Sequence, residues 1–355
     1  MKLYESIMWQ YIAEESKVLA NLLKRQDIKE LAEKLSAFKQ IYFISHGSSY
    51  NSSMTVMPFY ARYAKVNVHC ITAGNFIASE DIAALLDPED TLVVCISQTG
   101  NSRGTLLAAE LAKKYGLKTV GIAASTSATL KKYCDEFIEL QCGEEDSNAK
   151  TKGMSSTLLA LALFGTYLGY YKNNISEETV QKILKEFELQ VEELTSVKEK
   201  AVQFCKDNDF GKGVENFYII GSSMNYGLAL EAQIKLMETM CIPTCAVDTE
   251  EFSHGTHRAI HPDTHVLVIR SEENKELADK TFKYLNNMTN TYMIETFKEN
   301  ELKNVVQVEN HPYTQSILTI VEFIQVISAY GPENNGLDPN RDANNDFTDL
   351  VETRI

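Results

Sequence analysis

The chain has 355 residues, of which 44% are hydrophobic and 23% are charged, and its formal net charge is −15 at pH 7. This composition is typical of a globular protein and supplies material for about two domains. The acidic excess excludes a surface that binds nucleic acid, an anionic membrane or another large polyanion, because such ligands require a basic surface. A small anion remains compatible, since backbone N–H groups and hydroxyls at the start of a helix can hold a phosphate.

Residues 1–24 lack the basic and then apolar order of a signal peptide, and no apolar run reaches membrane-spanning length. Seven scattered cysteines indicate a reducing compartment rather than a disulfide framework. We therefore expect a soluble, cytoplasmic protein. Cys241 and Cys245 could form a metal or redox pair, but their spacing differs from common zinc and thioredoxin motifs, which favours buried packing.

The first predicted elements are helices within residues 1–35, and a first domain follows over residues 36–172. In this domain an apolar strand at 41–44 leads into the turn Gly47-Ser48-Ser49-Tyr50-Asn51. Further apolar, β-branched runs at 92–96 and 119–122 alternate with helical stretches. This alternation is typical of a parallel sheet with helices on both faces.

The second half of the chain repeats this order. Residues 217–220 lead into Gly221-Ser222-Ser223-Met224-Asn225, 174 residues after the first turn. An Asp-Thr strand entry and a closing serine recur at 90–97 and 263–271, with a one-residue slip in register. The repeat predicts an α/β protein with two tandem domains, each a parallel sheet of the Rossmann-like or flavodoxin-like kind.

Between the repeats, residues 173–212 read as a long charged helix that links the domains. Ser176 is a suitable N-cap, with Glu177 and Glu178 in the first turn. The second domain then covers 213–333. Residues 334–355 are rich in Asn, Asp, Gly and Pro, which predicts an extended C-terminal tail.

A hydroxyl-rich loop follows the strand at 92–96. Its residues Ser97 to Thr105 include four hydroxyl side chains and two glycines, and a helical stretch at 106–114 comes directly after. Open α/β sheets bind ligands at the carboxyl ends of their strands. A phosphate dianion is the natural occupant, because hydroxyls, free N–H groups and the helix dipole all favour it. Capping of the helix would account for one of the hydroxyls, but hardly for four.

Ser97-Gln98-Thr99-Gly100-Asn101-Ser102 resembles the phosphate loop of the SIS (sugar isomerase) domain family. Members similar to this chain are the isomerase half of glutamine-fructose-6-phosphate aminotransferase and the fructosamine-6-phosphate deglycases. The resemblance covers most of the chain and includes His46-Gly47-Ser48-Ser49 and, within 145–156, Ala149-Lys150-Thr151-Lys152. It implies two tandem SIS domains in which the phosphate is held by Ser97, Gln98, Thr99 and Ser102, with Ser49 near the sugar.

The equivalent loop of the second repeat reads Ser271-Glu272-Glu273-Asn274. Two carboxylates there would repel a phosphate, so we expect one phosphate site per chain.

A predicted helix at 228–238 places Glu231, Lys235 and Glu238 on one face. Such a stripe is usually a solvated, salt-bridged face. Here it interrupts a helix that is otherwise largely apolar, so we expect it to face a cleft or an interface. The pattern also resembles the catalytic helix of the aminotransferase's isomerase half.

The next segment, Glu250-Glu251-Phe252-Ser253-His254-Gly255, resembles a histidine turn of the family, although Glu250 and Thr256 replace the family's Gly and Pro. His254, His257, His261 and His265 could instead suggest a metal site, but they straddle a turn and a strand. We rank metal below an acid/base histidine and expect neither metal nor cofactor.

By resemblance, His254 opens the cyclic sugar and Glu238 transfers the proton between C1 and C2. Lys235 could stabilise the enolate, and Glu231 could orient Lys235 or His254. The family's tail lysine, which forms a Schiff base, aligns with Asp349, and no lysine follows Lys303. We therefore do not expect ring opening through a Schiff base. Because the first repeat begins near residue 36, we also do not expect amination that depends on glutamine.

These observations predict a phosphosugar isomerase or a deglycase of the fructosamine-6-phosphate type, active in amino sugar metabolism without glutamine. The alternative is a non-catalytic sugar-phosphate-binding regulator. No helix-turn-helix or basic region points to nucleic acid. The resemblance also implies a homodimer with sites between subunits.

Overall fold

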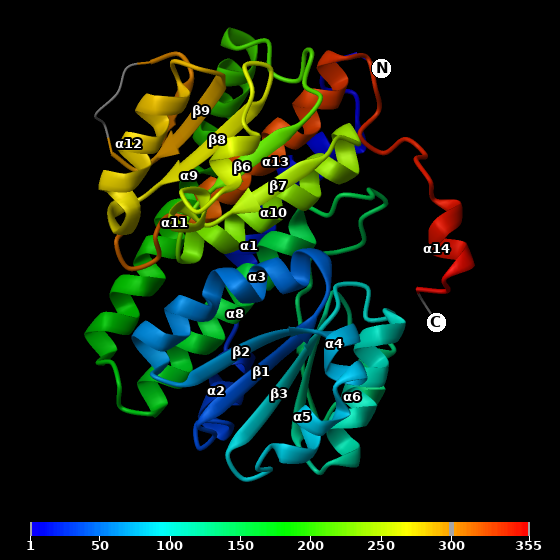
Figure 1. The fold of residues 1–355 in the computed structure, drawn as a ribbon. Coiled ribbons are helices and arrows are strands. Elements are labelled where there is room, and N and C mark those ends of the chain that lie inside the picture. Colours follow the sequence, from blue (N-terminus) through cyan, green and yellow to red (C-terminus); the bar gives the residue numbers. More distant parts are fainter. Residues whose placement is uncertain (1, 298–301, 354–355) are drawn as a thin grey trace. The chain divides into compact units, whose positions relative to one another are not determined.

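The computed structural model describes residues 2–297 and 302–353, and the chain divides into two compact units, each built on one parallel sheet (Figure 1). The first-sheet unit comprises Lys17–Glu145, Lys152–Leu184 and the tail from Asp342. The second-sheet unit comprises the residues up to Ser16 together with Asp146–Thr151 and Lys185–Arg341. Helices α1 (Ile7–Leu22) and α9 (Glu177–Asp207) contribute residues to both.

The sheet of the first-sheet unit has the strand order β2-β1-β3-β4-β5, with all pairs parallel. Its strands are β1 (Gln40–Ser45), β2 (Asn67–Thr72), β3 (Thr91–Ile96), β4 (Lys118–Ala123) and β5 (Glu136–Glu139). Every residue of β3 is buried, as expected for a central strand covered by helices on both faces. The strand order reverses between the neighbouring strands β1 and β3. In open α/β sheets, ligands bind at the carboxyl ends of the strands where the order reverses.

The helices of this unit are α2 (Asp27–Lys34), α3 (Gly47–Phe59), α4 (Ala73–Ala78), α5 (Glu80–Leu85), α6 (Arg103–Lys114), α7 (Leu130–Tyr133), α8 (Lys152–Tyr171) and α14 (Asp346–Leu350), with a π-helical turn η1 (Tyr60–Ala64). Figure 1 shows α4, α5 and α6 on one face of the sheet and α3 and α8 on the other. Side chains of α4 and α6 pack with β1 and β3 in one apolar cluster. α8 is buried from Lys152 to Gly169 because its sequence is apolar around almost its whole circumference.

The sheet of the second-sheet unit has the order β10-β9-β8-β6-β7, again all parallel. Its strands are β6 (Phe217–Ile220), β7 (Thr244–Val247), β8 (His265–Arg270), β9 (Asn290–Glu295) and β10 (Val305–Gln307). Read from β7, this order matches that of the first sheet read from β2. The predicted tandem α/β repeat of flavodoxin-like sheets is therefore confirmed.

The helices of this unit are α10 (Met224–Met240), α11 (Thr249–Phe252), α12 (Lys275–Leu285) and α13 (Ile317–Asn334), with 3-10 turns η2 (Thr256–Ala259) and η3 (Glu272–Asn274). α11 and α12 contribute to an apolar cluster with β6, β8 and β9. α13 is buried from Ile317 to Glu333 and packs on α10. Each unit thus has its own core.

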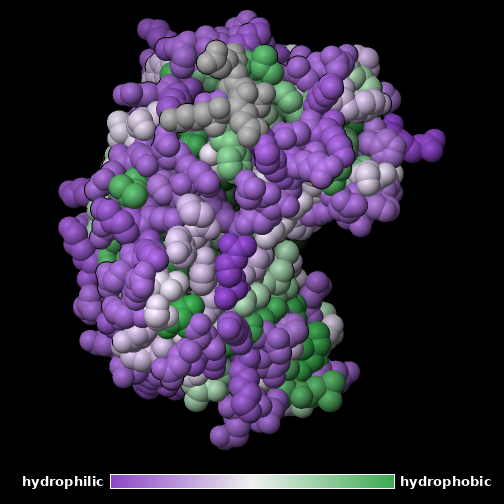
Figure 2. Space-filling model, turned by 90° about the vertical axis from the view of Figure 1, so that its left-hand side faces the viewer, coloured by the Kyte–Doolittle hydropathy of each residue, from purple (hydrophilic) through white to green (hydrophobic). Residues whose placement is uncertain are grey.

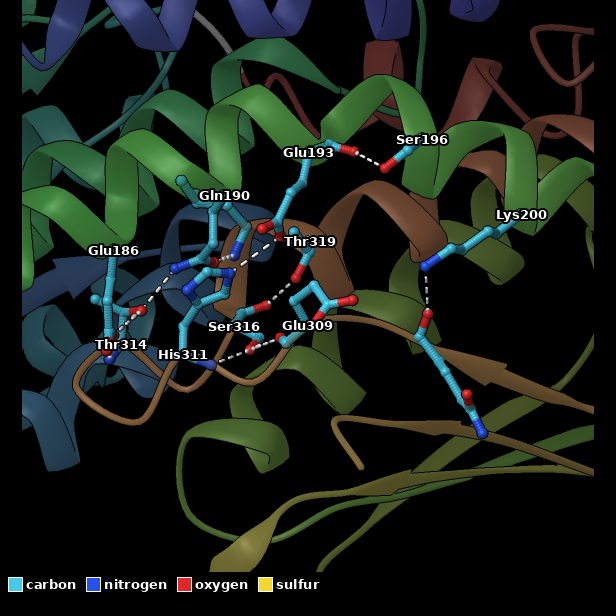
Figure 3. Close-up of polar contacts among 12 residues, drawn as sticks. Glu186, Gln190, Glu193, Ser196, Lys200, Glu309, His311, Thr314, Ser316 and Thr319 are labelled. Carbon is cyan, nitrogen blue, oxygen red and sulfur yellow. Dashed lines mark hydrogen bonds and ion pairs between the residues drawn. The ribbon is translucent and has the colours of Figure 1, made fainter. Parts of the chain in front are cut away.

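Helix α9 is anchored to the second-sheet unit by a polar cluster on the loop before α13 (Figure 3). Glu186 accepts hydrogen bonds from the N–H and Oγ1 of Thr314, both at 2.9 Å. Gln190 Nε2 donates to the same threonine oxygen at 2.6 Å, and the ring of His311 lies 3.0 Å from a carboxylate oxygen of Glu193. The side chains of Thr314 and His311 on the loop thus have partners on α9, which fixes both elements.

Two expectations about the linker and the tail have different outcomes. Ser176 Oγ accepts the N–H of Thr179 at 3.2 Å, so the predicted N-cap of the linking helix is confirmed. The tail, predicted to be extended, contains the short helix α14 instead. Its acidic start, Asp346, suits a helix N-terminus. The domain boundaries expected at 35, 172, 212 and 333 stay a prediction.

The surface agrees with the acidic, polar composition. Hydrophilic residues cover most of the face in Figure 2, and hydrophobic residues lie in smaller groups. Within the described residues, no helix combines the length and the apolar character needed to cross a membrane.

Candidate functional site

The carboxyl end of β1 leads directly into the serine turn expected to lie near a sugar. Gly47 has φ +54°, a conformation that glycine adopts without strain, and α3 begins there. Ser49 is half-buried in the first turn of α3. The preceding His46 has an exposed ring beside the first turn of α6, where a Cβ on Gly104 would lie 2.9 Å from its Nε2.

The hydroxyl loop after β3 is held by its own side chains. Ser97 Oγ donates to Ser102 Oγ at 3.0 Å and accepts the N–H of Gly100 at 3.1 Å. Gly100 has φ +66°, and a Cβ there would lie 2.3 Å from that of Ala128. Ser102 is the N-cap residue of α6, and Thr99 is exposed at the tip of the loop. The loop therefore presents hydroxyls at a helix N-terminus, an arrangement that suits a phosphate.

Gln98 is tied to a neighbour rather than left free. Its Nε2 donates to Glu145 Oε2 at 2.7 Å. Its carboxamide also packs on Gly153, where a Cβ would lie 1.9 Å from the amide carbon. Glu145 in turn accepts the N–H groups of Lys152 and Gly153 at 3.1 and 2.8 Å. The carboxylate thus joins the loop to the start of α8. Its negative charge interacts favourably with the dipole of the helix at this end.

Glu145 is a residue to which sequence reasoning assigned no role. It opens the segment 145–156 that carries the resemblance, and it stands seven positions before the first residue of α8. An acidic residue shortly before a long apolar helix was the available signal. Its partner Gln98 could not be identified without the fold, because the two are 47 positions apart.

The C-terminal tail contacts the start of α6. The N–H of Arg103 donates to the carbonyl oxygen of Thr353 at 3.1 Å, and its guanidinium lies 3.2 Å from the carboxylate of Glu352. Asp349, where the family's tail lysine would align, belongs to α14, but its side chain lies outside the described part of the structure.

The equivalent loop of the second sheet is acidic. Ser271 and Asn274 form a capping box around η3. The loop borders a cavity of about 550 Å³ whose charged lining residues are Glu250, Glu272, Glu273, Lys275, Glu276 and Asp279. An excess of carboxylates disfavours a phosphate dianion at this place.

Helix α10 carries the predicted charged stripe, and its first two members form a buried ion pair. Lys235 Nζ lies 2.6 Å from Glu231 Oε1, and the two side chains are 0% and 1% exposed. A buried charge requires a partner, and each of these residues supplies it to the other. Glu231 is therefore the partner of Lys235, and its expected role of orienting Lys235 or His254 stays a prediction.

Glu238 lies one turn further along and is half-buried. Its Oε2 has no hydrogen-bond partner among the described residues. Burial, opposed by the charges of Lys235 and Lys150, raises the pKa of this carboxyl to about 7. A carboxyl with a pKa near neutral pH can both take up and release a proton there, which is the property of a general acid/base.

His254 lies at the end of the turn after α11 and is exposed. Its Nδ1 is 3.0 Å from the carbonyl oxygen of Glu250 and 3.1 Å from Ser253 Oγ. Because a carbonyl only accepts, Nδ1 carries the hydrogen, and in the neutral ring Nε2 keeps its lone pair. The ring's hydrogen bonds in the described structure stay within this turn, so it is not joined to Glu231, Lys235 or Glu238.

The other histidines considered for a metal site are spread over different elements. His257 bonds to the carbonyl oxygen of Phe252, and His265 is buried in β8 beside the hydroxyl of Tyr292. Residues 2–297 and 302–353 contain no group of three or more His, Cys, Asp or Glu placed to hold a metal ion. The seven cysteines are free, and the buried packing expected for Cys241 and Cys245 is wrong, because Cys241 is exposed and Cys245 is half-buried.

Comparison with known proteins gives a family and a fold. Residues 34–167 match the model of the SIS domain. The glutamine-fructose-6-phosphate aminotransferase (isomerizing) of Clostridium tetani is 24% identical over 303 residues, which cover 81% of this chain and 48% of that protein. The chain thus spans about half the length of the curated relatives it matches.

Two solved structures are similar over nearly the whole chain. A protein of Clostridium difficile provisionally named a phosphosugar isomerase is 27% identical, has a TM-score of 0.89, and covers 98% of this chain and 99% of its own. The C-terminal domain of glucosamine-fructose-6-phosphate aminotransferase from Francisella tularensis is 21% identical, with a TM-score of 0.84, over 96% and 99% of the two chains. From these comparisons we conclude that residues 34–167 are similar to the SIS domain and that the chain shares the fold of these two solved structures over nearly its whole length.

Proposed function

We propose that this chain is a phosphosugar enzyme that binds a ketose or aldose 6-phosphate and transfers a proton between its C1 and C2. The observation that carries the proposal is Glu238, a half-buried carboxyl whose pKa lies at about 7. Removing a proton from the carbon beside a carbonyl needs a base close to neutral pKa, and the same group must return the proton to the neighbouring carbon.

The phosphate is assigned to the hydroxyl loop of the first-sheet unit. Ser97, Thr99 and Ser102 supply hydroxyls there, and Ser49 follows the adjacent strand β1. Gln98 contributes through the position of its backbone, because its side-chain amide is engaged by Glu145. No excess of basic residues is needed, which fits a chain with a net charge of −15.

His254 is proposed as the group that opens the sugar ring. The lone pair on Nε2 can take the proton of the anomeric hydroxyl, and its protonated form can return a proton to the ring oxygen. The hydrogen bond from Nδ1 to the carbonyl oxygen of Glu250 sets this tautomer.

Isomerisation and deglycation share the enediol or enolamine intermediate that Glu238 would form. In an isomerase the proton returns to the other carbon. In a deglycase the same return of the proton to C2 gives a C1 imine, and hydrolysis of this imine by water releases the amine and leaves the aldose. The geometry of α10 serves both, so both reactions belong to the proposal. The competing proposal is a regulator that binds the sugar phosphate without catalysing a reaction. The raised pKa of Glu238 favours catalysis.

The test is to incubate the protein with fructose 6-phosphate, glucosamine 6-phosphate and fructosamine 6-phosphate and to follow the products by NMR. Glu238→Gln should lower kcat by about 100-fold or more while the substrate still binds. The matched control Glu188→Gln, an exposed glutamate of α9 paired with Lys185, should keep full activity. Folded protein that binds these sugars and turns over none of them would leave the regulator as the function.

A further inference from the structure

Lys150 lies in a short segment that belongs to the second-sheet unit and reaches the end of α10. The N–H of Asn148 donates to Asn340 Oδ1 at 2.6 Å. The next residue, Arg341, donates from Nη1 and Nη2 to the carbonyl oxygens of the last two residues of α10, at 2.7 and 3.1 Å. These contacts bring the segment to the helix end that carries Glu238.

The side chain of Lys150 is held by its own turn. Its Nζ donates to the carbonyl oxygen of Ser147 at 2.8 Å, and Ser147 Oγ donates to the carbonyl oxygen of Ala149 at 2.9 Å. Ser147 and Ala149 are buried, whereas Lys150 is half-buried. The carbonyl oxygen of Ser147 fixes the position of the ammonium group. The turn therefore presents a preorganised cation.

The pKa of Glu238 is affected by two lysines that differ in exposure. Both Lys235 and Lys150 lower its pKa against the effect of burial. Lys235 is 0% exposed and lies 2.6 Å from the carboxylate of Glu231, so its charge is already engaged within the helix. Lys150 is the partly accessible lysine of the two. The role of enolate stabiliser, which the sequence suggested for Lys235, is thus better suited to Lys150.

We propose that Lys150 is a catalytic residue that holds the substrate's carbonyl oxygen and stabilises the enediolate formed when Glu238 removes the proton. This inference rests on the proposed function. In the step, the C–H bond breaks, its proton moves to the carboxylate of Glu238, and its electron pair forms the C–C double bond while the carbonyl electrons move to oxygen. The ammonium of Lys150 donates a hydrogen bond to that oxyanion, forms no covalent bond, and is unchanged when the proton returns to the other carbon.

The test compares Lys150→Met, which replaces the lysine by an unbranched, uncharged side chain one atom shorter, with Lys150→Arg, which keeps the charge. Lys150→Met should lower kcat by about 100-fold or more with a much smaller change in KM, because the charge acts on the developing oxyanion. Lys150→Arg should recover a large part of the loss. The matched control Lys200→Met removes a lysine of the same unit whose Nζ also donates to a backbone carbonyl, that of Gln307, and should leave kcat unchanged (Figure 3).

A second readout separates catalysis from structure. Without the cation, the pKa of Glu238 rises, so the acidic limb of the kcat/KM profile should move to higher pH in Lys150→Met. An equal melting temperature and equal binding of inorganic phosphate would establish that the variant is folded. A merely structural lysine would move neither the pH profile nor the exchange of the C1 and C2 hydrogens with deuterated water.

Three results would overturn the role of Lys150. An active wild type with a Lys150→Met variant of equal kcat would remove this inference and leave the proposed function standing. A sugar adduct on Lys150 after borohydride reduction with fructose 6-phosphate would replace the ionic role with an imine. A wild type that turns over none of the sugars would overturn both proposals. The pKa of Glu238 in the wild type and in Lys150→Met, measured by carbon-13 NMR, would then report only whether the charges of the two residues interact.

Discussion

Two glutamates of the same helix have different properties because their neighbours differ. Glu231 is buried against Lys235 at 2.6 Å, and the pair neutralises its charge. Glu238, seven positions later, is raised to a pKa of about 7, mainly by burial. Environments that separate the properties of similar groups are typical of sites with acid/base roles.

The raised pKa predicts how stability depends on pH. The carboxyl of Glu238 binds its proton more tightly in the folded state than at its ordinary pKa of 4.5, so stability is full below that value and falls as pH rises towards 7. Glu238→Gln removes this loss and should raise the free energy of unfolding at pH 8, relative to pH 5, by on the order of 3 kcal/mol. Urea unfolding at the two pH values measures the difference. Parallel pH dependences of variant and wild type would contradict it, and Glu188→Gln is the control.

At the scale of elements, α9 has two kinds of anchor. Its N-terminus is capped by Ser176, and its middle holds the loop before α13 through Glu186, Gln190 and Glu193 (Figure 3). The cap is local in sequence, whereas the loop contacts join residues more than 110 positions apart. A helix of 31 residues thus depends on both local and tertiary interactions.

The cap can be tested alone. Ser176→Ala removes the acceptor of the Thr179 N–H and should lower the free energy of unfolding by about 0.5–2 kcal/mol. Ser196→Ala removes a hydroxyl from the same helix whose bond, among the described residues, goes to the carbonyl oxygen of Glu193, and the change should alter stability by less than about 0.5 kcal/mol. Equal effects of the two substitutions, measured by urea unfolding, would argue against a capping role for Ser176.

At the scale of the whole molecule, the repeat makes two sheets of the same topology with unlike loops. The loop after β3 presents hydroxyls, and the loop after β8 presents carboxylates beside an acidic cavity. Duplication of a fold therefore does not duplicate its chemistry, because function depends on the loops at the strand ends.

The homodimer implied by the family resemblance stays a prediction of the sequence. Light scattering in about 0.15 M salt should give a mass of two chains. Higher salt should not dissociate it, because screening weakens the repulsion between two chains that each carry −15. A mass of one chain at low and high salt would reject the dimer.

The sequence by itself determined the fold class, the tandem repeat, the cap at Ser176 and the hydroxyl loop. These features depend on local patterns, because β-branched runs, glycine turns and polar residues at helix starts determine the conformation of neighbouring residues. Two structural expectations failed. The tail is not wholly extended, because a short helix, α14, forms despite a composition typical of loops, and Cys241 and Cys245 are exposed and half-buried rather than packed in the interior.

Only the tertiary structure decided which of the candidate residues have unusual chemistry. The pairing of Gln98 with Glu145 and the effect of Lys150 on Glu238 join segments far apart in the sequence. The pairing of Lys235 with Glu231 is local in sequence, but the burial of the pair depends on the fold. The pKa of Glu238 depends on how much water its neighbours exclude and on charges brought near it by folding. Desolvation and long-range charge are properties of packing, so no spacing along the chain could have predicted them.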